Sequence, residues 1–171
     1  CCGKFTKRIP ELQGQPKEYA GTITLGATTP SYDLETDVDE RYSIEHIDET
    51  LIRSTAAKFL GDIAQKPPVY SALKKEGKRL YEYAREGATV EIKTRMVHIA
   101  TFEITKIALP EVHFRVVCSK GTYIRSLAYD FGKAMQTGAY LSSLRRTKIG
   151  DYNVNKAILP EQFKTELAIE G

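Results

Sequence analysis

A strand, a tight turn and a helix that follow one another without a linker constrain this chain more than any other feature. Val112–Cys118 is an apolar, strand-like run, a Lys-Gly pair makes the turn, and Thr122–Met135 carries an apolar face at helical spacing. This geometry holds Tyr123 and Arg125 together at the mouth of a sheet, and a glycine-led segment, Gly138–Arg146, returns more cations to the same place. A basic pocket lined by aromatic side chains suits a flipped nucleotide base better than a small apolar ligand.

The remaining pattern predicts one α+β domain with a mixed, largely antiparallel sheet and flanking helices. At 171 residues the chain is long enough for one domain with its own core and too short for two large ones. The expected elements are a strand over Tyr19–Leu25, a helix capped by Asp48, a short helix over Lys78–Glu86, a hairpin that pairs Thr89–Leu109 with Glu111–Cys118, and a tail, Ala157–Leu167, that covers the core.

Charge is segregated along the sequence, although the net charge is only +3. Between Asp33 and Glu49 eight carboxylates face one arginine, and between Cys118 and Lys148 six cations face one aspartate. Either run alone is typical of a solvated surface face. Their combination with interleaved tyrosines favours a polyanion such as RNA as the partner, with an affinity that falls as salt is added.

Composition argues against several other classes of protein. No apolar run approaches the length of a membrane span, and the chain does not open on a signal-peptide pattern. The three cysteines are an odd number and two of them are adjacent, which argues against a disulfide framework and favours a cytoplasmic protein. The three histidines are scattered, so no spacing indicates a zinc site, and we expect no cofactor.

Several ordered motifs resemble one known family. The motifs are CSKGTYIRSLAYDFG and GAYLSSLRR in the C-terminal half, KEYAGTITLG near the start, and PPVYSALK with GKRLYEYAR between them. Over roughly residues 1–150 they resemble the catalytic domain of TruB-type tRNA pseudouridine synthases. The resemblance implies the pseudouridine synthase fold and a cofactor-free isomerase that converts a T-loop uridine of tRNA to pseudouridine.

The resemblance also assigns roles to individual residues. Arg125 matches the arginine that pairs with the catalytic aspartate, and Tyr19 matches the tyrosine that stacks on the target base and is proposed to act as the general base. Tyr123 and Leu144 match residues that line the uracil pocket, and Lys7 resembles a lysine at the end of the first basic segment. Taken alone, a strand tyrosine is more typical of packing and a lone helix arginine of a solvated surface.

Asp33 resembles the aspartate that follows the tyrosine strand in this family. The family usually has Thr-Asp-Thr before it, whereas this chain has Thr-Pro-Ser-Tyr. We therefore expect Asp33 to be structural and to close a turn.

A further set of residues is expected to bind RNA. The resemblance implies an insertion at about residues 65–95 that clamps the T-arm of tRNA through its phosphates. Each cation alone is typical of a solvated side chain, and only their clustering carries the prediction. The predicted RNA-binding residues are Lys66, Lys74, Lys75, Lys78, Arg79, Arg85, Lys120, Arg145 and Arg146.

One part of the family pattern is missing. The family's catalytic aspartate lies in a Gly-x-Leu-Asp-Pro-type motif, and no such motif occurs in the 171 residues. We therefore expect residues 1–156 to be a partial catalytic domain, inactive alone, that an N-terminal segment of the same protein completes. Residues 157–171 are expected to form a short tail without a separate RNA-binding domain, and the protein to be a monomer.

Two alternatives stay open at this point. The first is a non-catalytic RNA-binding or RNA-folding module for T-arm-like hairpins. The second is the guide-RNA branch of the same superfamily, in which accessory proteins position the substrate, although the short tail argues against it. Upstream sequence that contains Leu-Asp-Pro would favour the enzyme over the module.

Overall fold

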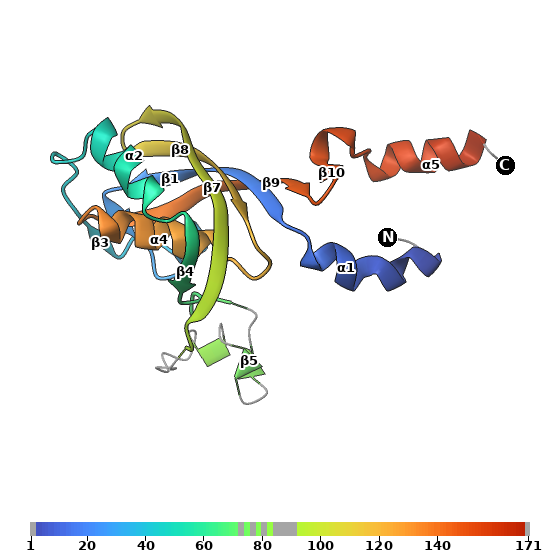
Figure 1. The fold of residues 1–171 in the computed structure, drawn as a ribbon, viewed down its shortest axis with the longest axis horizontal. Helices are drawn as coiled ribbons and strands as arrows, with labels where there is room; N and C mark the ends of the chain where they lie inside the picture. Colours follow the sequence, from blue (N-terminus) through green and yellow to red (C-terminus); the bar gives the residue numbers. More distant parts are fainter. Residues whose placement is uncertain (1–2, 72–73, 76–77, 80–81, 84–91, 170–171) are drawn as a thin grey trace.

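A six-stranded antiparallel sheet organises the computed structural model of the chain (Figure 1). The structure describes residues 3–71, 74–75, 78–79, 82–83 and 92–169. The strand order is β10-β9-β1-β8-β7-β4, and every neighbouring pair in it is antiparallel. The strands are β1 (Lys17–Leu25), β4 (Gly61–Gln65), β7 (Arg95–Ala108), β8 (Glu111–Cys118), β9 (Ala139–Ile149) and β10 (Tyr152–Asn153). The predicted α+β class with an antiparallel sheet is confirmed.

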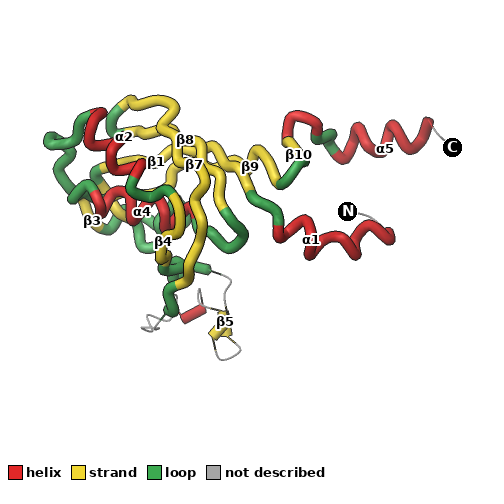
Figure 2. Tube along the Cα trace, viewed as in Figure 1, coloured by secondary structure: helices red, strands yellow, loops and turns green. Residues whose placement is uncertain are grey.

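The other elements are helices and short ladders around this sheet (Figure 2). They are η1 (Gly3–Arg8), α1 (Ile9–Gly14), β2 (Ala27–Thr28), β3 (Glu40–Arg41), α2 (Glu49–Ala57), β5 (Lys74–Lys75), β6 (Lys78–Arg79), α4 (Ile124–Ala134), η2 (Val154–Lys156) and α5 (Pro160–Ile169). No helix in the described ranges is long and apolar enough to cross a membrane.

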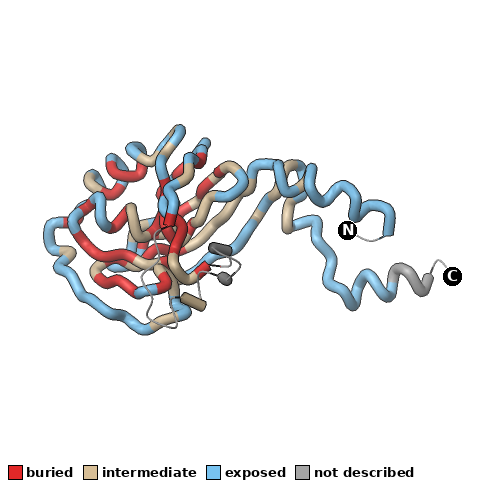
Figure 3. Tube along the Cα trace, turned by 90° about the horizontal axis from the view of Figure 1, so that it is seen from below, coloured by how far each residue is buried: buried red, intermediate tan, exposed pale blue. Residues whose placement is uncertain are grey.

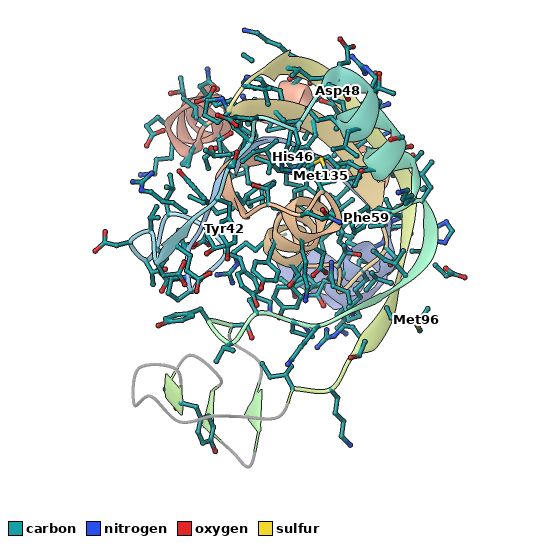
Figure 4. All side chains as sticks on the ribbon, turned by 90° about the vertical axis from the view of Figure 1, so that its left-hand side faces the viewer. Tyr42, His46, Asp48, Phe59, Met96 and Met135 are labelled. Atoms are coloured by element: carbon teal, nitrogen blue, oxygen red, sulfur yellow. The ribbon has the colours of Figure 1, made fainter. Side chains whose placement is uncertain are left out.

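The core lies between one face of the sheet and helices α2 and α4 (Figures 1 and 3). Strand β8 alternates strictly between buried and less buried residues, as expected for a strand with one face on a core. Phe102 of β7 lies 5.3 Å from Phe131 of α4 and 5.8 Å from Phe114 of β8, measured between ring centroids. Phe59, which follows α2, packs beside α4 in the same cluster (Figure 4). These rings attach α4 to the sheet and so determine where its first turn lies.

Several local predictions are confirmed. Strands β7 and β8 form the predicted hairpin, and α4 begins within two residues of the predicted start. Asp48 caps α2, since its Oδ1 accepts the backbone N–H of Leu51 at 2.7 Å. The acidic loop between β1 and α2 returns to the end of α4, where Nε2 of His46 lies 2.9 Å from the carbonyl oxygen of Met135 (Figure 4).

One local prediction is wrong, and another is wrong in part. The tail does not cover the core, because α5 projects away from the sheet on the same side as α1 and residues 157–165 are exposed (Figures 1 and 3). Helices α2 and α4 already cover the apolar face of the sheet. The helix expected over Lys78–Glu86 is contradicted at its start, because Lys78 and Arg79 form strand β6, which pairs with β5. Residues 82–83 are helical, as expected, and the rest of that segment lies outside the described residues.

Candidate functional site

Strand β1 forms the floor of the candidate site. In the β1–β9 ladder Tyr19 is opposite Arg146 and Gly21 is opposite Leu144, and directly opposed residues project from the same face. A Cβ atom on Gly21 would collide with the carbonyl oxygen of Ser143 and crowd the ring of Phe114. Glycine at position 21 therefore lets β9 approach β1 closely, which brings Leu144 and Arg146 beside Tyr19.

The first turn of α4 supplies the guanidinium of the site. Gly121, with φ of 89°, turns the chain from β8 into the helix. Arg125 Nη1 lies 3.1 Å from Asp33 Oδ2, and Arg125 Nη2 donates to the carbonyl oxygen of Tyr70 at 2.8 Å. The carboxylate of Glu35 lies 3.8 Å from the same Nη1. Three stretches of chain therefore meet at one arginine side chain that is only 21% exposed.

Asp33 has a second role besides the expected one. It does close a turn, because its Oδ1 accepts the backbone N–H of Glu35 at 3.0 Å. Its other oxygen forms the ion pair with Arg125, 92 positions along the chain. The loop that carries it is attached to β9, where the N–H of Leu141 donates to the carbonyl oxygen of Tyr32 at 2.9 Å. The predicted turn at Asp33 is therefore confirmed, while its ion pair with Arg125 was not expected from the sequence.

These groups line an open cavity of about 380 Å³. One wall is the acidic loop with Arg125, and the other is the start of β9. Leu144 is 45% exposed and Leu34 is 65% exposed, so the cavity presents apolar side chains as well as charges. A cavity of this size, with apolar walls and a few charged groups, is typical of a site for a small ligand. The lining residues are Asp33, Leu34, Glu35, Arg125, Leu141, Ser142, Ser143 and Leu144.

Cations gather around Tyr19 on the same face of the sheet. Burial raises the pKa of the Tyr19 phenol, and the nearby Cys118 adds to the rise, while Arg146 opposes it. Burial, followed by repulsion from Lys120, lowers the pKa of Lys17, and Arg146 contributes to the same lowering. Lys120 and Arg146 therefore both lie near Lys17, whose ammonium group donates to the carbonyl oxygens of Gln13 and Gln15.

Tyr123 lies beside the cavity rather than in its lining. It precedes the first residue of α4, and its backbone N–H and carbonyl group are both bound by the side chain of Gln65. The guanidinium carbon of Arg95 lies 5.6 Å from the centre of its ring. Neither Gln65 nor Arg95 was expected from the sequence. The one sequence signal for Gln65 is its position just before Lys66-Pro67-Pro68.

The structure divides the predicted RNA-binding residues. Arg146 shares a face with Tyr19, but Arg145 is opposite Ala20 and projects from the other face of the sheet. Lys7 lies in η1, where it is exposed, and it is not among the residues that line the cavity. Lys66 lies directly after β4, and its carbonyl oxygen accepts the hydroxyl of Ser126 at 2.8 Å. The remaining cations of the insertion are in β5 and β6, namely Lys74, Lys75, Lys78 and Arg79, while Arg85 lies outside the described residues.

The described part of the chain offers no obvious metal centre. No group of three or more His, Cys, Asp or Glu side chains lies close enough together there to hold an ion. Cys118 is a free, buried cysteine. The polar groups that line the cavity are two carboxylates, one guanidinium and two serine hydroxyls.

The comparisons with known proteins agree over nearly the whole chain. Residues 1–124 match the family described as TruB family pseudouridylate synthase (N terminal domain). Residues 125–170 match the tRNA pseudouridylate synthase B C-terminal domain. Similar proteins include tRNA pseudouridine synthase B of Flavobacterium johnsoniae, 66% identical over 98% of this chain and 73% of that protein. The protein of the same name from Bacteroides fragilis is 50% identical over 95% of this chain and 70% of that protein.

Solved structures share the fold at lower identity. A Cbf5–Nop10–Gar1 complex matches with a TM-score of 0.60 and 27% identity over 86% of this chain. An H/ACA RNP bound to a substrate RNA containing 2′-deoxyuridine matches with a TM-score of 0.60 and 23% identity. The chain spans 34% of the length of each of these structures.

Proposed function

The chain belongs to the TruB family of pseudouridine synthases, and from this premise we propose that it forms the uridine pocket of an enzyme that isomerises a tRNA uridine to pseudouridine. The observation that carries the proposal is the cavity that both Arg125 and Leu144 line. Tyr19 lies two positions along β1 from Gly21, which is the ladder partner of Leu144. Residues assigned from two separate motifs therefore share one cavity, and the residue of a third motif lies on the neighbouring strand.

The reaction needs groups of these kinds. The bond between N1 and the ribose must break, the uracil must turn, and C5 must bond to the ribose carbon. The proton on C5 then leaves and N1 gains one. A carboxylate starts the reaction at the sugar or the base, and an arginine paired with it keeps it ionised and directed. Aromatic and apolar side chains hold the detached ring.

We propose that the attacking carboxylate comes from outside these 171 residues, since no Gly-x-Leu-Asp-Pro-type motif occurs among them. Asp33 and Glu35 would then hold the guanidinium of Arg125 in the orientation that receives this carboxylate. The 3.1 Å contact between Arg125 and Asp33 supports that role. Residues 1–156 would form a partial catalytic domain. The match to the C-terminal family runs across residue 156, and this boundary stays a prediction.

The proposed role of Tyr19 is mainly to hold the base. Because burial raises the pKa of its phenol, the hydroxyl is protonated at neutral pH and the ring is available for stacking. To take the C5 proton, Tyr19 would first have to pass its own proton on, and Arg146 would stabilise the phenolate that results. Tyr123 and Leu144 would complete the walls around the uracil.

The proposed substrate is the T-arm of tRNA, which would place the protein in the cytoplasm. The names of the relatives support tRNA, and the cations around Tyr19 support a polyanion. The insertion after β4 would grip the phosphates of the arm, and we propose that the protein acts as a monomer without a cofactor. The alternative is an RNA-binding or RNA-folding module that holds the same hairpin without reacting with it.

Tritium release from a T-arm hairpin labelled at C5 of its uridine tests the proposal, because the new carbon–carbon bond expels that label. We expect the full-length protein to release the label, and the 171-residue chain to bind the hairpin without release. Binding without release by the full-length protein would favour the RNA module. Release by the 171-residue chain would place the attacking carboxylate inside it, and Asp33→Asn would then test whether Asp33 is that group.

A further inference from the structure

The side chain of Gln65 is buried completely at the point where β4 ends. Its Oε1 accepts the backbone N–H of Tyr123 at 2.8 Å, and its Nε2 donates to the carbonyl oxygen of Tyr123 at 3.1 Å. One amide thus satisfies both main-chain groups of one residue across 58 positions of sequence. A buried amide is costly to desolvate, so it is retained only where such bonds offset that cost.

Tyr123 is the residue at which α4 begins. It precedes the helix in an extended conformation and has no side-chain cap of its own. The amide oxygen of Gln65 therefore takes the place of a cap at this end of the helix. Arg125 follows two residues later, so the position of Tyr123 also determines where the guanidinium lies.

Other contacts tie the same region to the helix. The hydroxyl of Ser126 donates to the carbonyl oxygen of Lys66 at 2.8 Å, and Arg125 donates to that of Tyr70 at 2.8 Å. On the neighbouring strand, Arg95 is the ladder partner of Gln65, and its guanidinium lies 5.6 Å from the centre of the Tyr123 ring. The two strands that flank residues 66–94 thus both contact Tyr123 from their last paired position.

We propose that Gln65 is a positioning residue for the uridine pocket, which places Tyr123 and, through the first turn of α4, Arg125, while Arg95 orients the ring of Tyr123. The inference rests on the proposed function for its catalytic consequence. Gln65 itself does not line the cavity, so it acts through the residues that it holds. The reaction depends on the placement of Arg125, and a small displacement of such a group slows chemistry more than it weakens binding.

The test uses Gln65→Met in the full-length protein, because methionine matches the length of glutamine but makes neither hydrogen bond. We expect the single-turnover rate of tritium release to fall about tenfold or more, while hairpin affinity changes less than about twofold. Asp48→Ala is the matched control. It removes the cap of α2, far from the cavity, so it should lower the melting temperature and leave the single-turnover rate unchanged.

Gln65→Glu separates hydrogen bonding from packing. When its carboxyl is protonated it can donate and accept as the amide does, and burial favours the protonated form. Between about pH 5.5 and 8.5, we expect its rate relative to wild type to rise as the pH falls, above that of Gln65→Met. A Gln65→Glu rate that never exceeds that of Gln65→Met would assign the loss to packing and overturn the inference.

A second readout does not depend on activity. In ¹H–¹⁵N spectra, Gln65→Met should shift the backbone amide of Tyr123 and the Nε–H of Arg125, whereas Asp48→Ala should leave both in place. Unchanged signals of Tyr123 and Arg125 in Gln65→Met would overturn the inference even in an inactive protein. Absence of tritium release from the wild-type protein would instead overturn the proposed function, so the two failures are distinguishable.

Discussion

The two faces of strand β1 use charge in opposite ways. On the front face, defined by Tyr19 and Gly21, Arg146 acts on the half-buried phenol of Tyr19, and Lys17 and Lys120 lie near each other. On the back face, defined by Glu18, Ala20 and Thr22, Arg115 lies 3.0 Å from Glu18 and 2.9 Å from Glu103. The charges of Glu18 and Arg115 on the back face are therefore neutralised within the fold, whereas we expect Arg146 on the front face to contact a ligand.

The alternation of side chains along one strand thus places structural contacts on one face and the candidate site on the other. Neighbouring residues such as Glu18 and Tyr19 differ in face by the pleat alone. Thr147 also donates to Glu18 at 2.8 Å, and the hydroxyl of Thr22 lies 3.1 Å from Nδ1 of His113, so several polar side chains of the back face bind one another. The front face ends at the cavity that contains Arg125.

The largest expected effect comes from Arg125→Ala in the full-length protein, which removes the one cation of the cavity lining. Single-turnover tritium release should fall about a thousandfold, because the attacking carboxylate loses its partner, while hairpin affinity stays within about twofold. Arg115→Ala on the back face is the control and should keep the wild-type rate. An unchanged rate in Arg125→Ala would contradict the proposal that the cavity at the front face is the catalytic site.

The next largest effect is expected for Gly21→Ala, which should displace β9 from β1 and so disturb both faces. The added methyl group collides with the backbone of Ser143, which no side-chain rotation can relieve. We expect a loss of about 2 kcal/mol in the free energy of unfolding, measured by urea denaturation. Gly14→Ala is the control, since its Cβ meets no atom within 4 Å. Equal stability of the two variants would contradict the close approach of the strands.

Arg146→Ala and Arg145→Ala test which face of the sheet binds RNA, because the two residues are adjacent but project from opposite faces. Removal of one phosphate contact lowers the slope of log affinity against log salt by about 0.7–0.9. We expect that change for Arg146→Ala and a wild-type slope for Arg145→Ala, measured by salt titration of hairpin binding. The opposite result would place the RNA on the back face.

The smallest expected effect concerns pH. The hydrogen bond from Thr147 and the neighbouring Arg115 lower the pKa of Glu18 in the folded protein. Because the folded pKa lies below the unfolded value of about 4.3, the ionised group stabilises the fold above that pH, and the contribution is lost as the pH falls through the folded pKa. The melting temperature of wild type should therefore fall more steeply below about pH 4.3 than that of Glu18→Gln. Parallel curves of melting temperature against pH for the two proteins would contradict a stabilising role of the contacts of Glu18.

Much of the fold could be predicted from local sequence. The strand over Tyr19–Leu25, the β7–β8 hairpin, the cap at Asp48 and the helix after Gly121 each depend on periodicity, caps or turns within about a dozen residues. The tail was predicted wrongly, because the space against the sheet was already filled by helices that lie elsewhere in the sequence.

The candidate site likewise has parts that the sequence predicts and parts that it does not. The sequence by itself determined which residues carry the family motif, and that Arg125 lies just inside a helix, because motifs, turns and helix starts depend on neighbouring residues. Only the tertiary structure decided that Asp33 pairs with Arg125, that Gln65 holds Tyr123, and that Arg145 and Arg146 serve different faces. The first two contacts join segments 92 and 58 residues apart, and the third depends on strand register. Long-range pairing and register are decided when the core packs, since no local preference distinguishes one distant partner from another.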